Sequence, residues 1–202
     1  MKKNLASILI VLLVAVGFCG FTTVVYGQAD AGLISSFLNQ AKSASDSQLG
    51  DIASELTGKV QSLAAAGGVS DAIKSKLDST LKALTGGKDS AALTSAFGLV
   101  KSAKLTPEQL GLAKQVGNLA SAYVVQKNFA SLAGQQGDVA TIVSSLRCGK
   151  VSDALPSLKN VAANAKLTDT QKHLITTIAD KYAPGLNQAA GAFEGIKKLP
   201  GF

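Results

Sequence analysis

Apolar residues recur along most of the chain at the three- and four-residue spacing of an α-helix. The pattern is clearest over residues 92–103, where Ala92, Leu93, Ala96, Leu99, Val100 and Ala103 trace one helical face. After residue 27, no stretch alternates apolar and polar residues with the β-branched enrichment that strands require. Ala and Leu, which are strong helix formers, dominate these segments, and Gly or Pro separates them. The pattern therefore predicts an all-α protein.

The helical pattern also repeats along the chain. The apolar face of residues 92–103 recurs in residues 154–165, and the tetrapeptide that ends in Thr106 recurs 62 residues later, ending in Thr168. Capping-box sequences, in which a side-chain oxygen can accept from unpaired N–H groups, start at these two threonines and at Ser45. This periodicity predicts three related three-helix units, at about 31–86, 87–148 and 149–202.

Nine helices are expected in these units, at residues 31–43, 46–66, 69–85, 89–103, 106–133, 137–147, 151–165, 168–182 and 185–198. In the longest helix the apolar stripe rotates, which predicts a kink or break near residues 125–128. Units of this size must bury their apolar faces against one another. The sequence leaves two architectures open, a helical bundle and a short α-solenoid.

The N-terminal segment, residues 1–27, has the composition of a secretory signal. Lys2 and Lys3 precede an apolar run, and no residue from 4 to 27 is charged. Cleavage would leave either Gln28 or Gly32 as the first residue, and residues 28–202 would form the helical domain. The uncharged stretch is also long enough to serve as an uncleaved membrane anchor. We expect a periplasmic, cell-surface or extracellular protein, anchored in the membrane if the segment is retained.

The charge distribution argues against nucleic-acid binding. The net charge of +7 falls to +5 when Lys2 and Lys3 are removed, and Arg147 is the only arginine. Arginine is preferred for bidentate contacts with phosphate and guanine. The lysines are scattered and have no interleaved aromatic residues. Nucleic acid is therefore not an expected partner.

Few residues could support catalysis, a cofactor or a metal ion. His173 is the only histidine, and Asp169, one helical turn earlier, could orient it. This spacing is more typical of a solvated pair on a helix surface. The carboxylates Asp51 and Glu55 likewise fit a wet helix face, and the Gly-Lys pairs lack the remaining residues of a phosphate-binding loop. We therefore expect no enzyme activity, no cofactor and no metal site.

Four residues remain as candidates for contacts with partners. Cys148 is the only cysteine left after cleavage, either a small buried residue or an intermolecular thiol. Tyr123 and Tyr182 lie near the ends of equivalent helices and mark either a binding groove or the edge of the core. Phe202 ends a tail that is either a partner-docking segment or a frayed terminus.

The leading hypothesis is a non-catalytic interaction or structural protein of the cell envelope or exterior. Its helices would present a surface to another protein, to a polymer or to copies of itself. The second hypothesis is binding to lipid or a membrane surface, because amphipathic helices with lysine on the polar face can lie on anionic bilayers. Alanine-rich faces and the lack of tryptophan favour helix packing over membrane anchoring. An unrecognised enzyme is the third hypothesis.

Overall fold

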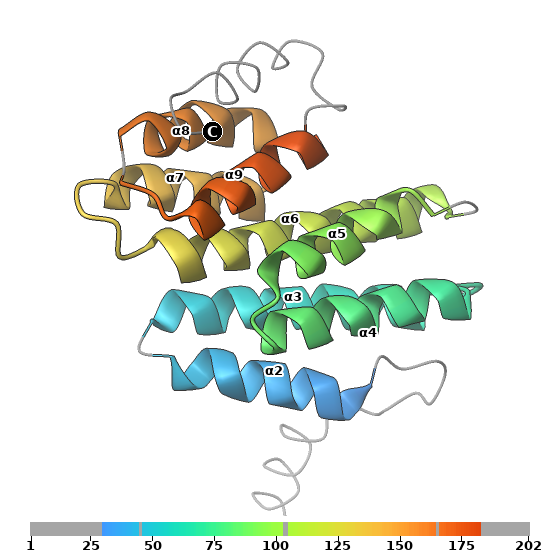
Figure 1. The fold of residues 1–202 in the computed structure, drawn as a ribbon. Helices are drawn as coiled ribbons and strands as arrows, with labels where there is room; N and C mark the ends of the chain where they lie inside the picture. Colours follow the sequence, from blue (N-terminus) through green and yellow to red (C-terminus); the bar gives the residue numbers. More distant parts are fainter. Residues whose placement is uncertain (1–29, 45, 103–104, 165, 183–202) are drawn as a thin grey trace, which may run out of the picture.

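The computed structural model describes residues 30–44, 46–102, 105–164 and 166–182, and these residues form eight α-helices and no strand (Figure 1). The all-α prediction is therefore confirmed. The N-terminal segment 1–27 and the ninth predicted helix, 185–198, lie outside the described residues. The helices are α2 (Ala31–Ser43), α3 (Ser47–Ala65), α4 (Asp71–Thr85), α5 (Asp89–Val100), α6 (Pro107–Phe129), α7 (Gln136–Arg147), α8 (Val151–Asn164) and α9 (Asp169–Tyr182).

The helices pack as a bundle around α6. Helix α6 contacts α3, α5, α7 and α9, while α2 packs on α3 and α4 at one end and α8 packs mainly on α7 at the other (Figure 1). Helices α3 and α6 run antiparallel, because the start of α3 at Asp46 meets Gln126 near the end of α6. A single hydrophobic core extends through all eight described helices.

Equivalent positions of the sequence repeat are buried in both copies. The core takes in four pairs from α5 and α8, namely Ala92 and Ala154, Leu93 and Leu155, Ala96 and Leu158, and Leu99 and Val161. In the following helices, Ala113 and Val116 of α6 are buried like Ile175 and Ile178 of α9. The same apolar face is therefore turned to the core in both stretches. The last pair of the repeated face, Ala103 and Ala165, lies outside the described residues.

Two of the three predicted capping boxes form as expected. Thr106 Oγ1 accepts from the Gln109 backbone N–H at 3.2 Å, and the Gln109 side chain accepts from the Thr106 N–H at 3.0 Å. Thr168 and Gln171 make the same two contacts at 3.2 and 2.9 Å. At the third box the cap is Asp46, one residue later than predicted. Its carboxylate accepts from the Gln48 N–H at 2.9 Å, and Ser45 lies outside the described residues.

The predicted break in the longest helix is wrong. Helix α6 continues through residues 125–128 and ends at Phe129, four residues before the predicted end. Every residue from Leu119 to Gln126 is buried. Because α6 is surrounded by four helices, its rotating apolar stripe meets a neighbour on each side, and no kink is required to bury it.

The repeated Gly-Lys pairs terminate helices. Gly87 and Gly149 have φ angles of 69° and 71°, the left-handed conformation that glycine adopts without steric cost. After each glycine, the lysine N–H donates to a carbonyl five residues earlier, with Lys88 N to Ala83 O and Lys150 N to Ser145 O both at 2.8 Å. This is the Schellman arrangement of a helix C-terminus. The repeated Gly-Lys pair thus ends both α4 and α7.

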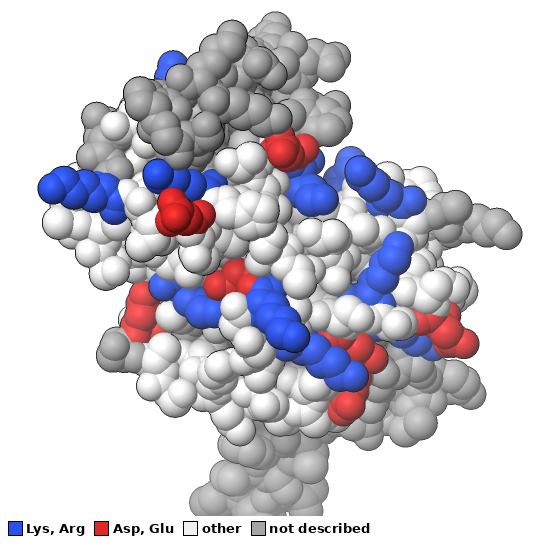
Figure 2. Space-filling model, viewed as in Figure 1, with Lys and Arg blue, Asp and Glu red and all other residues white. Residues whose placement is uncertain are grey.

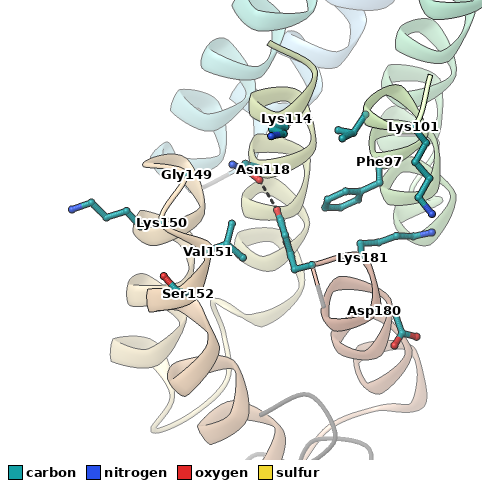
Figure 3. Close-up of a pocket in the computed structure, with 12 residues that line it drawn as sticks. Phe97, Lys101, Lys114, Asn118, Gly149, Lys150, Val151, Ser152, Asp180 and Lys181 are labelled. Atoms are coloured by element: carbon teal, nitrogen blue, oxygen red, sulfur yellow. Dashed lines mark hydrogen bonds between the residues drawn. The ribbon is translucent and has the colours of Figure 1, made fainter. Parts of the chain in front are cut away.

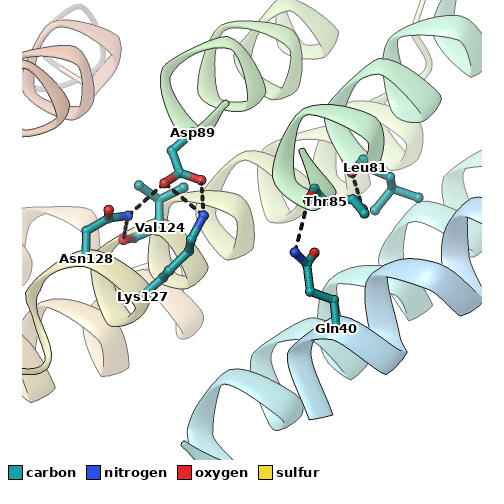
Figure 4. A network of polar contacts seen from close by, with 7 residues as sticks. All are labelled: Gln40, Leu81, Thr85, Asp89, Val124, Lys127 and Asn128. Atoms are coloured by element: carbon teal, nitrogen blue, oxygen red, sulfur yellow. Dashed lines mark hydrogen bonds and ion pairs between the residues drawn. The ribbon is translucent and has the colours of Figure 1, made fainter. Parts of the chain in front are cut away.

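Long polar side chains cap the C-terminal ends of neighbouring helices. Gln40 of α2 donates to Thr85 O at the end of α4 at 3.0 Å (Figure 4), which explains why this residue interrupts the apolar pattern of its helix. Lys76 donates to Gly98 O of α5 at 3.0 Å. Gln109 and Gln171 donate to Gly67 O and Asn128 O, both at 2.7 Å. These bonds satisfy carbonyls at or just after helix C-termini, and Gly98 O also accepts from Ser102 Oγ at 3.1 Å.

Replacing Gln109 with Met should lower the free energy of unfolding by about 1–3 kcal/mol, because Gly67 O and the Thr106 N–H lose their partner at a buried position. Met and Gln have similar helix propensities, so the effect isolates the hydrogen bonds. Urea unfolding followed by circular dichroism measures it. The matched control is Gln115→Met, at an exposed position of the same helix. Equal stabilities of the two variants would contradict this account.

Candidate functional site

A pocket of about 670 Å³ lies where four helices converge, between the C-terminal ends of α5 and α9, the middle of α6 and the start of α8 (Figure 3). Ligand pockets commonly have volumes of roughly 300–1,000 Å³. The lining comes from Phe97, Val100, Lys101, Lys114, Asn118, Gly149, Lys150, Val151, Ser152, Asp180, Lys181 and Tyr182. Because these residues come from four separate stretches between residues 97 and 182, only the fold brings them together.

The apolar wall is built around Tyr182, at the end of α9. Its ring meets Phe97 of α5 edge to face, with centroids 4.9 Å apart and an interplanar angle of 88°. The Tyr182 hydroxyl donates to Asn118 Oδ1 at 2.9 Å and lies 3.3 Å from Ser121 Oγ, both on α6. Burial raises the pKa of the Tyr182 hydroxyl, so it is un-ionised at neutral pH. Tyr182 therefore holds α9 against α6, and its uncharged side chain forms part of the pocket wall.

The Schellman turn between α7 and α8 closes another side. Gly149 in this turn lies so close to α6 that a β-carbon there would sit 3.6 Å from Asn118 Nδ2. The turn delivers Val151 and Ser152, at the start of α8, to the pocket. The Gly149-Lys150 pair therefore does more than end α7. It also places the first turn of α8 beside the pocket.

Lysines supply most of the charge around the pocket. Lys101, Lys114, Lys150 and Lys181 line it together with one acid, Asp180. In Figure 3, Lys101 and Lys181 extend on the α5 and α9 side, Lys114 lies at the upper edge, and Lys150 points away from the pocket. The ion pairs between described residues involve none of these four lysines. The site therefore combines apolar walls with an excess of positive charge at its rim.

The residues singled out from the sequence do not form one site. Both tyrosines belong to the core, but only Tyr182 also lines the pocket; Tyr123 is 3% exposed, with its ring centroid 5.0 Å from that of Phe37. Cys148 is exposed at the end of α7, which contradicts the alternative of a buried cysteine. Phe202 lies outside the described residues.

The histidine-carboxylate pair considered from the sequence does not form. Asp169 is exposed and pairs with Lys172 at 3.8 Å. His173 Nε2 instead lies 3.1 Å from Ser90 Oγ of α5. In the part of the chain that the structure describes, no three His, Cys, Asp or Glu side chains come together in a way that could hold a metal ion.

Other polar clusters connect helices. Asp89, 8% exposed at the start of α5, accepts from Lys127 at 3.0 Å and from Asn128 at 2.9 Å, both on α6 (Figure 4). Glu55 of α3 pairs with Arg147 of α7. The Glu55 carboxylate thus joins two helices instead of facing only water. Each of these contacts ties together segments that are far apart in the sequence.

Sequence reasoning found Tyr182 but missed the rest of the pocket. Phe97 carried a signal, because it is a large apolar residue outside the repeated helical face, beside Ala96. Lys101, Lys114 and Lys181 carried none, since each resembles a lysine on any solvated helix. Their proximity depends on how α5, α6 and α9 cross.

Comparisons of the chain with protein-family models, with curated protein sequences and with solved structures found no match. None of the helices within residues 30–182 that the structure describes has the length and apolarity needed to cross a membrane. On the face seen in Figure 2, lysine and acidic side chains are interspersed. The pocket between α5, α6, α8 and α9 is the feature of the described surface that we consider as a candidate binding site.

Proposed function

We propose that this protein is a non-catalytic binding protein of the cell envelope or exterior, and that the pocket between α5, α6, α8 and α9 is its binding site. The observation that carries the proposal is the pocket itself, which combines an apolar wall with polar and charged groups around it. This is the usual constitution of a small-ligand site. Its phenol, Tyr182, is occupied by a hydrogen bond to Asn118. That bond favours a structural role for the side chain over proton transfer.

The burial of the helical faces favours this proposal over binding to a membrane surface. The apolar stripes of α5 and α8 are packed in the core, so they are not presented to a bilayer. Membrane binding through these faces would require the bundle to open and lose its core. A pocket provides an apolar contact surface without that cost.

Export is part of the proposal, and the start of α2 favours one of the two cleavage sites. The Asp30 carboxylate accepts from the Gly32 N–H at 2.8 Å and caps α2. The Asp30 N–H donates to Asp78 of α4 at 3.3 Å. Cleavage that left Gly32 first would remove both contacts, whereas cleavage that left Gln28 first would keep them. We therefore propose Gln28 as the first residue of the exported chain.

We also propose that the bundle consists of three related units. The equivalent burial in α5 and α8 supports this division, and so do the box glutamines. Gln109 bonds the carbonyl of Gly67 just after α3, and Gln171 bonds that of Asn128 at the end of α6. Each box glutamine thus joins the second helix of its unit to the corresponding helix of the preceding unit.

The proposed function is tested by native mass spectrometry of the chain isolated from its own cell fraction without denaturation. The expected result is an exported chain beginning at Gln28 that carries a small molecule, which is lost on denaturation. Val151→Trp, which fills the pocket from a partly buried wall position, should abolish this retention. Val69→Trp makes the same change in the α3–α4 loop and should not. A cytosolic chain, or identical native and denatured masses for the unsubstituted protein, would contradict the proposal.

A further inference from the structure

We infer that the pocket binds a free, single-chain anionic amphiphile, such as a medium-chain carboxylate. This inference rests on the proposed function and names the chemical class of its ligand. Two properties of the lining carry it, the apolar wall on one side and the unbalanced positive charge on the other.

The apolar wall of the pocket favours a ligand with a hydrocarbon body. The rings of Phe97 and Tyr182 form a rigid edge-to-face pair, and Val100 and Val151 lie among the lining residues. An alkyl chain that covers these groups removes apolar surface from water on both partners, which favours binding through the hydrophobic effect. The Tyr182 hydroxyl donates to Asn118, so this phenol presents its ring and not a free donor to a ligand.

The lysines at the rim of the pocket favour a ligand with a negatively charged headgroup. Lys101, Lys114 and Lys181 lie around the opening, and their ammonium groups take part in none of the ion pairs between described residues. The first turn of α8, at Val151 and Ser152, adds little to this charge, because Asp153 in the same turn offsets the partial positive charge of the helix N-terminus. Asp180 offsets one of these charges, and a net excess remains. A cationic headgroup would be repelled, and a neutral one would gain less.

The geometry favours a free amphiphile over a lipid embedded in a bilayer. The apolar contacts are with the walls of a pocket among four helices, so the chain of the ligand must leave the bilayer to reach them. Lysines that act as point charges at the rim do not impose a particular headgroup shape. A monocarboxylate is the simplest ligand that satisfies both requirements.

The test compares three ligands with the same ten-carbon body, decanoate, decanol and decylammonium, by calorimetric titration of the full exported chain. Decanoate should bind most tightly, and added salt should weaken its binding, because Lys101 and Lys114 are exposed to solvent and Lys181 is partly exposed. The double variant K101Q/K181Q should weaken decanoate binding by roughly 3- to 10-fold and leave decanol unchanged, as expected for two charge pairs that are reached by solvent. The matched control K42Q/K159Q removes the same charge at exposed positions outside the pocket and should have no effect.

The outcomes separate this inference from the proposed function. Equal binding of all three ligands, blocked by Val151→Trp, would overturn the anionic ligand and leave the binding pocket intact. The same holds if none of the three binds but the native chain retains another small molecule. Decanoate binding that Val151→Trp leaves unchanged would place the ligand elsewhere and overturn the inference. Sedimentation with anionic vesicles that Val151→Trp does not affect, without decanoate binding, would overturn it in favour of a membrane surface.

Discussion

Truncating Leu155 to Ala should lower the free energy of unfolding by about 2–5 kcal/mol, and Leu93→Ala should have an effect of similar size. Both side chains are buried, Leu93 completely and Leu155 with 5% exposure. They occupy equivalent positions of the sequence repeat, on α5 and α8. Each truncation removes core contacts and leaves a cavity that the surrounding helices fill only in part. Urea denaturation monitored by circular dichroism gives both values.

The controls for these truncations are exposed residues of the same two helices. Thr94→Ala in α5 and Lys159→Ala in α8 should stay within about 0.5 kcal/mol of the unsubstituted protein. If Leu155→Ala were as mild as Lys159→Ala while Leu93→Ala remained severe, the two copies would not share a buried face. The proposed relation between the units would then be lost.

Stability should fall steeply in alkaline solution. Burial raises the pKa of Tyr182 and Tyr123 in the folded protein, and Asp89 adds to the effect at Tyr123. In the unfolded chain both hydroxyls titrate near pH 10. Below that pH both states hold the protons and the contribution to stability is constant. Above it the unfolded chain releases protons that the folded chain retains, so stability falls with pH, and the limiting slope is about 1.4 kcal/mol per pH unit for each tyrosine that stays protonated in the folded protein.

Urea unfolding at a series of pH values from 8 to 12 measures how the free energy of unfolding changes with pH. Replacing one tyrosine at a time shows how much of this slope each of them contributes. Tyr182→Phe should reduce the slope by one tyrosine's share. At neutral pH it should also cost about 1–3 kcal/mol, because the part-buried contact with Asn118 Oδ1 and the buried contact with Ser121 Oγ are lost. Tyr123→Phe, whose ring keeps its contact with Phe37, should reduce the slope as well. A slope that neither replacement changes would show that other groups control the alkaline transition.

One titrating side chain belongs to both the core and the candidate site. Tyr182 closes the pocket on one side and joins α9 to α6 on the other. Ionisation of this hydroxyl should therefore release the end of α9 and the pocket wall together. Loss of decanoate binding and loss of helical signal are expected to occur in the same pH range.

Most of the helix boundaries followed from local chemistry. Helix ends were set by the capping boxes at Thr106 and Thr168 and by Gly87 and Gly149. These residues act on backbone groups a few positions away, so their effects can be predicted from the sequence. The error at the start of α3 was also local. Both Ser45 and Asp46 are capping residues, and their order alone does not reveal which of them caps the helix.

The pocket was not predictable in the same way. Tyr182 stood out because it lies near the end of the second helix of its unit, yet Tyr123, chosen by the same argument, does not line the pocket. The difference between the two is set by their neighbours, Phe97 in one case and Phe37 in the other. Neither contact has a signature in the sequence, because each joins residues from separate helices.

By itself the sequence determined the all-helical class, the repeated apolar face and most helix ends, because these depend on spacing and capping within a few turns of chain. The tertiary structure decided that the described helices form a bundle around α6 and that this helix runs unbroken to Phe129. It also decided that lysines from α5, α6 and α9 surround an apolar pocket. The physical reason is that helix crossing depends on how side chains from distant segments interlock, and no local pattern encodes that arrangement.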